Sequence, residues 1–512
     1  MITRDELYLQ KSINSADEQR TTGFLPRRDV APWPLVTPLD WAADPFNDPN
    51  WCFQLNAWRM TDCLLAEYFQ KFDSSLLREA MEFAFDWHAF NVVAKRQNAI
   101  AWYDMAVGIR AMRLAFFWQA VAAGKLDISQ AEMAILNHLV KLHIENLTVE
   151  SNISINNHGI FQVAGLANFC AVGLADEVVR DFARSKLDQI MSQQFTEEWV
   201  HTENSPSYHW MLKGLLGNLK SLRYLNEKFD ANLSHVDSVA RCLVFPDGVV
   251  APIGDSVGTA PLPILPEEPE VRDFTRSGYA IVRSKESMLF VTGMAHNTIH
   301  KHADDLSFHL YEFGRHVFID PGKYGYTKND PIRAYLTSAA AHNTISLLEK
   351  RISPQEIAID GSQLAPIQLC SDGYIIKGEC IRPALFRQQR TIRYMPAVSI
   401  DIVDEVSAAE TRSFASSLHI GPGLVPIASP NGFTLDCGTH TMVAAAHADH
   451  DFWVEAVSGW REPLIGWWSP SYLKSEEIYT VRVIVEASTT TIRWHVDFVR
   501  NEPDQVRQAE ER

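Results

Sequence analysis

The sequence contains few cysteines and no Cys-x-x-Cys pair. The seven cysteines are widely separated, at Cys52, Cys63, Cys170, Cys242, Cys370, Cys380 and Cys437. This scatter is typical of reduced thiols, several of them buried, and does not suggest a disulfide framework.

Positive charge is scarce as well. Lysine and arginine number 46 against 63 aspartates and glutamates, which gives a formal net charge of -17 at pH 7. Binding to a phosphate backbone requires a basic surface, so nucleic acid is excluded as the main partner. An anionic substrate remains compatible with this charge, because a local group of cations can override the global field.

Long hydrophobic runs are missing too. No run is long and apolar enough to span a bilayer, and the start of the chain, Met-Ile-Thr-Arg-Asp-Glu-Leu, has no apolar signal core. We therefore expect a cytoplasmic protein if Met1 is the native start, and a periplasmic one if the N-terminus has been trimmed. Neither a phosphate-binding glycine loop nor a paired-carboxylate signature for hydrolysis stands out.

The pattern of apolar residues changes along the chain. A length of 512 residues and a hydrophobic content of 46% suggest a folded protein of two or three domains. Spacings of three and four residues predict helices over 50–72, 74–90, 102–123, 129–145, 160–173, 176–194 and 205–228. Helices of this length with short links are typical of a bundle, a solenoid or a toroid.

Beyond residue 245 a turn-rich connector leads into short runs of β-branched and aromatic residues. Strands are predicted over 279–282, 288–292, 308–313, 316–319, 373–377, 391–394, 398–404 and 479–485. The fold class expected is multidomain α+β, a helical domain followed by antiparallel sheets. The expected limits are 1–44 for an N-terminal extension, 45–260 for the helical domain, 270–500 for the β domain and 501–512 for a frayed tail. A ligand site is expected where the two domains meet.

Histidine and aspartate cluster between residues 300 and 342. The stretch contains His300-Lys-His302-Ala-Asp304, then Asp320-Pro-Gly, then His342-Asn-Thr. These side chains bind zinc and transfer protons near neutral pH. On one extended segment, His300, His302 and Asp304 would point to the same face. A solvated strand edge is the alternative for any one of these residues, whereas the whole cluster favours a site.

Two motifs in the helical part have a structural and a functional interpretation. Asn156-Asn157-His158-Gly159 is a good helix start, yet it also places Asn157 and His158 where helix amides favour an anion. Similarly, the serine and proline before Tyr208 form a helix start. The helix dipole there would lower the pKa of Tyr208. Alternatively, Tyr208 simply packs on the next turn of its helix.

Taken together, these segments resemble the heparinase II/III-like polysaccharide lyases. The motifs that carry the resemblance run in order from about residue 48 to the end of the sheets. They are Trp102 with Arg110, Asn157-His158-Gly159, Glu203-x-Ser205-x-x-Tyr208-His209, Asp247-Gly248 with Gly254-Asp255-Ser256, His300-x-His302-x-Asp304, Asp320-x-Gly322 and His342-Asn343-Thr344. The resemblance implies an incomplete (α/α) toroid followed by an antiparallel β-sandwich.

The resemblance also implies a reaction, β-elimination on a uronic-acid polysaccharide or oligosaccharide. Asn157 would hold the uronate carboxylate, and His158 would assist or act as the base for one C5 epimer. Tyr208 would be the general base or the acid that protonates the departing O4, and His300 a further catalytic histidine. Substrate contacts would come from Trp102, Asn156, Arg110, Glu203 and His209.

A zinc site is implied as well. His302, Asp320 and His342 match the ligands of a mainly architectural Zn²⁺, with a fourth position left to water or another side chain. Two alternatives to the lyase remain: a non-catalytic protein that binds acidic glycans or takes part in surface-polysaccharide assembly, and a glycoside hydrolase with Glu203 or Asp104 as its acid. A homo-oligomer is compatible with each of them.

Overall fold

A computed structural model describes residues 2–96, 98–221, 227–294, 296–327 and 329–501. By its contacts the chain divides into two compact units. The first contains the chain up to Gln194 together with Leu212–Ser234, and the second contains Phe195–Met211 and the chain from His235 onward. The predicted limits of 45–260 and 270–500 stay predictions. The predicted tail, 501–512, lies outside the described residues except for Asn501.

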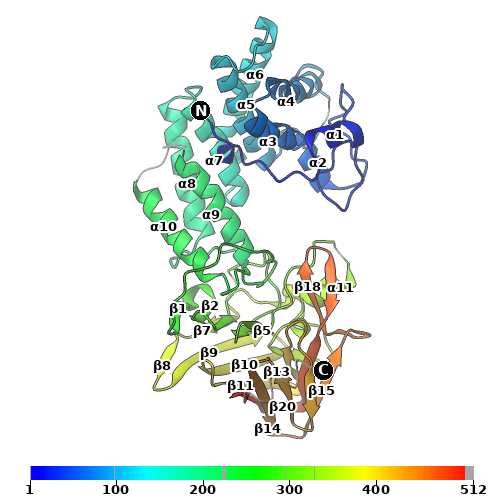
Figure 1. The fold of residues 1–512 in the computed structure, drawn as a ribbon, viewed down its shortest axis with the longest axis vertical. Helices are drawn as coiled ribbons and strands as arrows, with labels where there is room; N and C mark the ends of the chain where they lie inside the picture. Colours follow the sequence, from blue (N-terminus) through cyan, green and yellow to red (C-terminus); the bar gives the residue numbers. More distant parts are fainter. Residues whose placement is uncertain (1, 97, 222–226, 295, 328, 502–512) are drawn as a thin grey trace. The chain divides into compact units, whose positions relative to one another are not determined.

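Helices make up most of the first unit, from the blue to the green part of the chain in Figure 1. They are α1 (Ala16–Thr22), α2 (Pro49–Asn56), α3 (Thr61–Lys71), α4 (Ser74–His88), α5 (Asp104–Ala122), α6 (Gln130–Leu147), α7 (Asn157–Ala171), α8 (Glu177–Gln194), α9 (Pro206–Ser221) and α10 (Glu227–Cys242), with short turns η1 (Asp5–Leu7), η2 (Ala89–Val93) and η3 (Glu150–Asn152). Most of the helices predicted from spacing are confirmed. The one predicted over 50–72 is divided, because Trp58 between α2 and α3 has a left-handed backbone (φ 56°). Of the one predicted over 205–228, α9 accounts for Pro206–Ser221, and residues 222–226 lie outside the described residues.

Helices α5 and α7 pack with their backbones in close approach. A Cβ added at Gly108 would lie 2.3 Å from the carbonyl oxygen of Phe161, and one at Gly165 would lie 2.8 Å from the Cβ of Ala111. Only glycine allows this separation at both positions. The contact fixes the start of α7, which carries Asn157 and His158, against the helix that begins at Asp104.

The segment expected as an N-terminal extension is part of the helical unit. Leu7, Phe24 and Trp41 are buried. The Gln19 side chain donates a hydrogen bond of 2.9 Å to the carbonyl oxygen of Met60, at the start of α3. Residues 2–44 therefore pack as an integral layer of this unit.

The second unit contains two main antiparallel sheets. The smaller has the order β1 (Glu270–Phe274), β2 (Tyr279–Arg283), β3 (Met288–Thr292), β4 (Phe308–Glu312) and β5 (Arg315–Phe318). The larger has the order β12 (Pro426–Ser429), β13 (Gly432–Asp436), β14 (His440–Ala448), β20 (Tyr479–Arg500), β11 (Ser399–His419), β10 (Phe386–Met395), β9 (Gly373–Arg382) and β7 (Ser362–Leu364), with β6 (Ile345–Leu347), β8 (Gln368–Cys370) and β15 (Phe452–Ser458) paired at its sides. Two short hairpins, β16 (Trp460–Arg461) with β17 (Leu464–Ile465) and β18 (Trp467–Ser471) with β19 (Lys474–Glu477), and the helix α11 (Pro331–Leu336) complete the unit.

The smaller sheet is buried on both faces. Val282, Leu289 and Phe308 pack into one core together with Ile402 and Trp494 of the larger sheet. On the other face, residues of β2–β4 pack against the end of α10 and the segment that follows it. This explains why every residue of β2, β3 and β4 is buried, whereas β10 alternates between buried and more exposed residues.

A buried polar network joins the two sheets. Arg390 donates to both carboxylate oxygens of Asp404 and to the carbonyl oxygens of Leu306 and Asn343. The Asn343 side chain donates to the carbonyl oxygens of Phe308 and Ile319. Asn343 is therefore a structural residue whose side chain holds the end of β5 next to the start of β4.

All seven cysteines are free, and all but the partly exposed Cys370 are buried. Among the helices of the described residues, none is long and apolar enough for a bilayer crossing.

Candidate active site and metal centre

The start of α7 is built as the sequence indicated. The Asn156 side chain accepts the backbone N–H of His158 at 2.8 Å and so caps the helix. A Cβ at Gly159 would lie 1.8 Å from the carbonyl oxygen of Ser154, so only glycine fits there. Asn157 and His158 occupy the first turn and are partly exposed.

His158 is held by an acidic partner that lies 54 positions earlier in the chain. Its Nδ1 is 2.5 Å from a carboxylate oxygen of Asp104, whose other oxygen accepts the hydroxyl of Ser154 at 2.7 Å. Burial opposes ionisation of Asp104, but the hydrogen bonds from His158 and Ser154 outweigh it and lower the pKa of this carboxyl below its ordinary value. The Asp104 carboxylate therefore fixes the Nδ1–H tautomer of His158 and directs Nε2 away from Asp104.

Arg110 is unsuited to the substrate contact predicted for it. Its side chain is fully buried, and its guanidinium donates to the carbonyl oxygens of Asn56 and Ala101 and to Nε2 of His143. It also lies 4.4 Å from the ring centroid of Trp87. The guanidinium N–H groups that a sugar carboxylate would need already donate to these internal carbonyl oxygens. Arg110 is therefore a structural residue. The neighbouring Trp102 is 36% exposed.

The segment before α9 is tied to the loop that carries His300. The Asn204 side chain donates to the carbonyl oxygens of Asn297 and Ile299 at 2.9 and 3.0 Å. A Cβ at Gly254 would lie 2.5 Å from the carbonyl oxygens of both Asn204 and His300. These contacts bring Tyr208, in the first turn of α9, against His300.

Tyr208 and His300 form the centre of the candidate active site. Their rings stack with centroids 3.8 Å apart and an interplanar angle of 23°. The Tyr208 hydroxyl lies 2.9 Å from the hydroxyl of Tyr326. Burial raises the pKa of Tyr208, and the charges of Asp255 and Glu203 add to this, while the hydrogen bond from Tyr326 acts in the opposite sense. The predicted fall in this pKa is thus wrong, because desolvation outweighs the helix dipole; the phenol is protonated at neutral pH.

Two carboxylates flank the His300 ring. Nδ1 lies 3.1 Å from Asp255, and Nε2 lies 3.6 Å from Glu203. Asp255 also accepts Nε2 of His302 and the guanidinium of Arg333, each at 3.2 Å. Burial alone would raise the pKa of the Asp255 carboxyl, but hydrogen bonds from the two histidines hold it well below its ordinary range. Asp255, which sequence reasoning placed in a motif without a role, therefore connects the active site to the metal-type cluster.

Glu203 and His209 were predicted to contact the substrate, but both side chains are buried in the structure. Glu203 is buried beside His300. His209 is buried too, with Nε2 2.9 Å from the carbonyl oxygen of Val236 and Nδ1 accepting the backbone N–H of His201. Both residues support their neighbours, and neither presents a face to a sugar.

The expectation that His300, His302 and Asp304 share one face of a strand is wrong. Residues 300–307 form a loop between β3 and β4, and His300 and Leu306 have left-handed backbones with φ of 56° and 59°. His300 points to Tyr208 and His302 to His342, with ring centroids 5.4 Å apart in the latter pair. Asp304 instead forms an ion pair with buried Lys301. The three side chains therefore point in different directions because the loop turns, and strand alternation does not apply.

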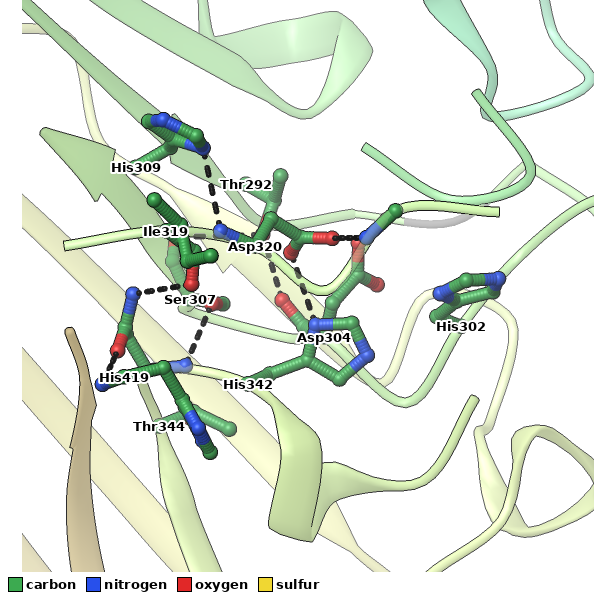
Figure 2. Close-up of polar contacts among 12 residues, drawn as sticks. Thr292, His302, Asp304, Ser307, His309, Ile319, Asp320, His342, Thr344 and His419 are labelled. Atoms are coloured by element: carbon green, nitrogen blue, oxygen red, sulfur yellow. Dashed lines mark hydrogen bonds and ion pairs between the residues drawn. The ribbon is translucent and has the colours of Figure 1, made fainter. Parts of the chain in front are cut away.

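His302, Asp320 and His342 do come together. Their ligand atoms all lie within 4.8 Å of one another and the three residues are buried. His342 Nδ1 lies 2.8 Å from a carboxylate oxygen of Asp320 (Figure 2). His302 Nδ1 and His342 Nε2 are buried and have no hydrogen-bond partner among the described residues. Buried imidazole nitrogens without partners are costly, and a metal ion bound at this cluster would satisfy such atoms. The donor set therefore fits a transition metal, and Asp255 on His302 Nε2 is the kind of outer partner that orients a ligating histidine.

Sequence reasoning missed three residues at the Tyr208–His300 pair. Tyr326 touches the Tyr208 hydroxyl, Lys323 lies over the Tyr208 ring, and the guanidinium of Arg333 lies 5.3 Å from the ring centroid of Tyr326. The run Pro-Gly-Lys-Tyr-Gly-Tyr directly after Asp320 was the signal available, because glycine and aromatic residues next to a metal-type aspartate indicate a shaped loop.

The chain was compared with known proteins. Residues 266–495 match the family model described as Heparinase II/III-like, C-terminal. The solved structure of Heparinase III superimposes with a TM-score of 0.74 and 14% identity, covering 98% of this chain and 86% of that one. Heparan sulfate lyase HepC from Pedobacter heparinus gives 0.70 and 14%, covering 98% and 84%. Chondroitin AC lyase from Streptomyces coelicolor A3, in complex with chondroitin sulphate, gives 0.57 and 10%, covering 97% and 80%.

A search of curated protein sequences gives no match to the chain. At these identities the likeness to solved structures concerns the fold alone. It confirms the predicted fold class, a helical toroid-type domain followed by an antiparallel β-sandwich. The family match confirms the resemblance on which the site residues were chosen.

Proposed function

We propose that this protein is a polysaccharide lyase that cleaves an acidic, uronic-acid-containing glycan by β-elimination. The match of residues 266–495 to the heparinase II/III-like C-terminal family model supports this proposal. The observation that carries the proposal is the Tyr208 phenol, which burial keeps protonated and which stacks on His300. The His300 ring is in turn flanked by Asp255 and Glu203. A phenol and imidazoles with fixed partners suit proton transfer without a covalent intermediate.

In the proposed reaction, a base removes the C5 proton of the uronate and the C5–H electron pair forms a C4=C5 double bond. The C4–O4 bond breaks, and O4 leaves with a proton supplied by an acid. The proton lies next to a carboxylate that is already negative, so this group must be neutralised before a weak base can act. The products are an unsaturated uronate and a shortened chain.

The residues of the chain divide these tasks by their chemistry. Asn157 is the proposed donor to the uronate carboxylate, and His158, oriented by Asp104, the proposed base for one C5 epimer. Tyr208 is the proposed acid toward O4, since its raised pKa leaves the proton on the hydroxyl. His300 completes the set by positioning the phenol through its stacked ring.

We further propose that His302, Asp320 and His342 bind Zn²⁺. The fit of the donor set and the partnerless imidazole nitrogens support this assignment. When bound, the ion would supply a fixed positive charge that ties three loop segments together, an architectural role. Proton transfer is assigned to the side chains listed above.

A glycoside hydrolase with Asp104 as its acid is less consistent with the site. Asp104 has a lowered pKa and is ionised at neutral pH, whereas a general acid must hold a proton. Hydrolysis would also add one water to the products, which elimination does not. A non-catalytic glycan-binding protein would release no product at all.

Product analysis tests the proposal directly. The protein is incubated with heparan sulfate, chondroitin sulfate, hyaluronan and alginate, and products are followed by ultraviolet absorbance and mass spectrometry. We expect unsaturated oligosaccharides from at least one polymer, and the solved relatives named for heparan sulfate and chondroitin make these two the first to test. Saturated products heavier by one water would identify a hydrolase, and intact polymers throughout would argue against a lyase of these glycans.

A further inference from the structure

Lys323 places a positive charge beside the candidate acid. Its ammonium lies 4.4 Å from the ring centroid of Tyr326 and 5.8 Å from those of Tyr208 and Tyr472. The backbone is fixed on both sides, since Lys323 N–H donates to the carbonyl oxygen of Ser256 at 3.3 Å and its own carbonyl accepts the hydroxyl of Ser469 at 2.7 Å. The side chain therefore extends from a rigid position toward the three rings.

The charge of Lys323 has no acidic partner of its own. No described residue forms an ion pair with its ammonium, whereas the nearby Arg333 pairs with Asp255 and donates to the carbonyl oxygen of Gly325. Burial lowers the pKa of the Lys323 ammonium, with the charge of Asp255 opposing and that of Arg333 reinforcing this effect. Contact with the aromatic rings offsets part of this desolvation cost, and an oxyanion would offset more.

We propose that Lys323 is a specificity-determining residue that binds an oxyanion, a carboxylate or a sulfate, of the acidic sugar presented to Tyr208. The inference rests on the proposed lyase function and names the group of the substrate that this part of the site would recognise. The rings of Tyr208, Tyr326 and Tyr472 would exclude water around the contact and strengthen it. The alternative is that Lys323 only packs its stem and charge on the rings.

Replacement of Lys323 by methionine separates the two readings, because methionine keeps most of the apolar stem and removes the charge. Affinity is measured by calorimetry for three forms of one ligand: a heparan sulfate hexasaccharide, its desulfated form, and the desulfated form with its carboxyl groups reduced. We expect Lys323→Met to weaken binding of the sulfated hexasaccharide about 10–100-fold, as for loss of a hydrogen bond to a charged group, and to leave the neutral form unaffected.

The three ligands also identify the oxyanion. A carboxylate contact predicts that the loss persists with the desulfated hexasaccharide, and a sulfate contact predicts that it disappears there. Lys323→Arg should retain affinity within about threefold. Lys377→Met, at an exposed lysine of β9, is the matched control and should bind as the wild type does.

Equal affinity of wild type and Lys323→Met for the sulfated hexasaccharide overturns the inference, as does a wild-type protein that does not bind it. Melting temperatures establish that each variant is folded, and Lys323→Gln replaces the methionine variant if that one is not. Failure of the lyase function is seen separately, as absence of unsaturated product, so the two failures are distinguishable.

Discussion

At the scale of single residues, His158 depends on Asp104 for its tautomer. The 2.5 Å contact between Nδ1 and the carboxylate requires the imidazole proton on Nδ1 and leaves the lone pair on Nε2. A base at the start of α7 needs that lone pair directed toward its substrate. Asp104 is therefore a positioning residue that acts through His158.

Replacement of Asp104 by asparagine should reverse this arrangement. The asparagine amide would donate to Nδ1 and force the proton onto Nε2, so His158 could not accept one. We expect kcat/KM to fall about 10²–10⁴-fold on a substrate whose epimer uses His158, with KM nearly unchanged. Steady-state kinetics measure the change. Ser154→Ala, which removes the other hydrogen bond to Asp104 without changing the tautomer, should cost less than about tenfold; equal losses in both variants would indicate a structural role alone.

At the scale of elements, loops position both the acid and the metal-type cluster. The first turn of α9 supplies Tyr208, and the turn around Gly254 supplies Asp255. Segments outside the strands supply His300 and the three candidate zinc ligands, His302, Asp320 and His342. The asparagine after His342 and buried Arg390 fix the strands from which these loops leave. The geometry of the loops is therefore tied to the core of the sandwich.

Metal removal tests the cluster at this scale. Protein purified without added metal should carry about one zinc per chain, and chelation should lower the melting temperature, because an ion that binds the folded state at 1,000 times its Kd contributes about 4 kcal/mol. Elemental analysis and thermal unfolding measure both effects. His342→Ala should lose the zinc and no longer respond to chelator, while His447→Ala, at an exposed histidine of β14, should retain it. Protein that contains no transition metal, and whose melting temperature does not change with chelator, would contradict the zinc assignment.

The sequence predicted the composition of these loops but not their course. Histidine and aspartate cluster in this stretch, and His302, Asp320 and His342 could be selected from it because they match the zinc-site motifs of the heparinase II/III-like lyases. Their arrangement could not be predicted, since it depends on left-handed turns at His300 and Leu306 that nothing local requires. For the same reason the pKa of Tyr208 was predicted in the wrong direction: helix position is readable from sequence, and burial next to Asp255 is not.

At the scale of the whole molecule, periodicity predicted the two-part fold. Helical spacing and short β-branched runs are dictated by local burial patterns, so most of the predicted helices and strands correspond to observed elements. Many short strands were not predicted, and β11 and β20 extend well beyond the predicted 398–404 and 479–485. The N-terminal 44 residues were expected as an extension, and in the structure their Leu7, Phe24 and Trp41 are buried. Integration of this kind depends on long-range packing, which no local pattern records.

The free energy of unfolding should depend on pH through one buried carboxyl group, that of Glu312. Glu312 on β4 accepts the hydroxyl of Tyr394, and burial raises its pKa from 4.5 to about 7. The folded protein retains this proton between those values while the unfolded chain releases it, so the group's contribution to stability is lost as pH rises from 4.5 to about 7. The cost above pH 7 is about 3 kcal/mol.

Glu312→Gln removes this titration. Urea unfolding gives the free energy of unfolding of each protein at pH 5 and pH 8. Between these pH values the wild type should lose about 3 kcal/mol more than the variant, so the variant is relatively more stable at pH 8. Glu405→Gln, on the exposed side of β11, should leave the pH dependence unchanged. Parallel pH profiles of wild type and Glu312→Gln would contradict the assignment.

The most direct test of the account is product formation by Tyr208→Phe on the polymer that the wild type cleaves. The phenyl ring keeps the stack on His300 and loses only the hydroxyl, so folding and oligosaccharide binding should be preserved. Because the proposed acid is gone, release of unsaturated uronate should fall at least about 10²–10⁴-fold. Tyr374→Phe, in β9, serves as the control and should act at the wild-type rate. A Tyr208→Phe protein that releases unsaturated product as fast as the wild type would contradict the assignment of Tyr208 as the acid.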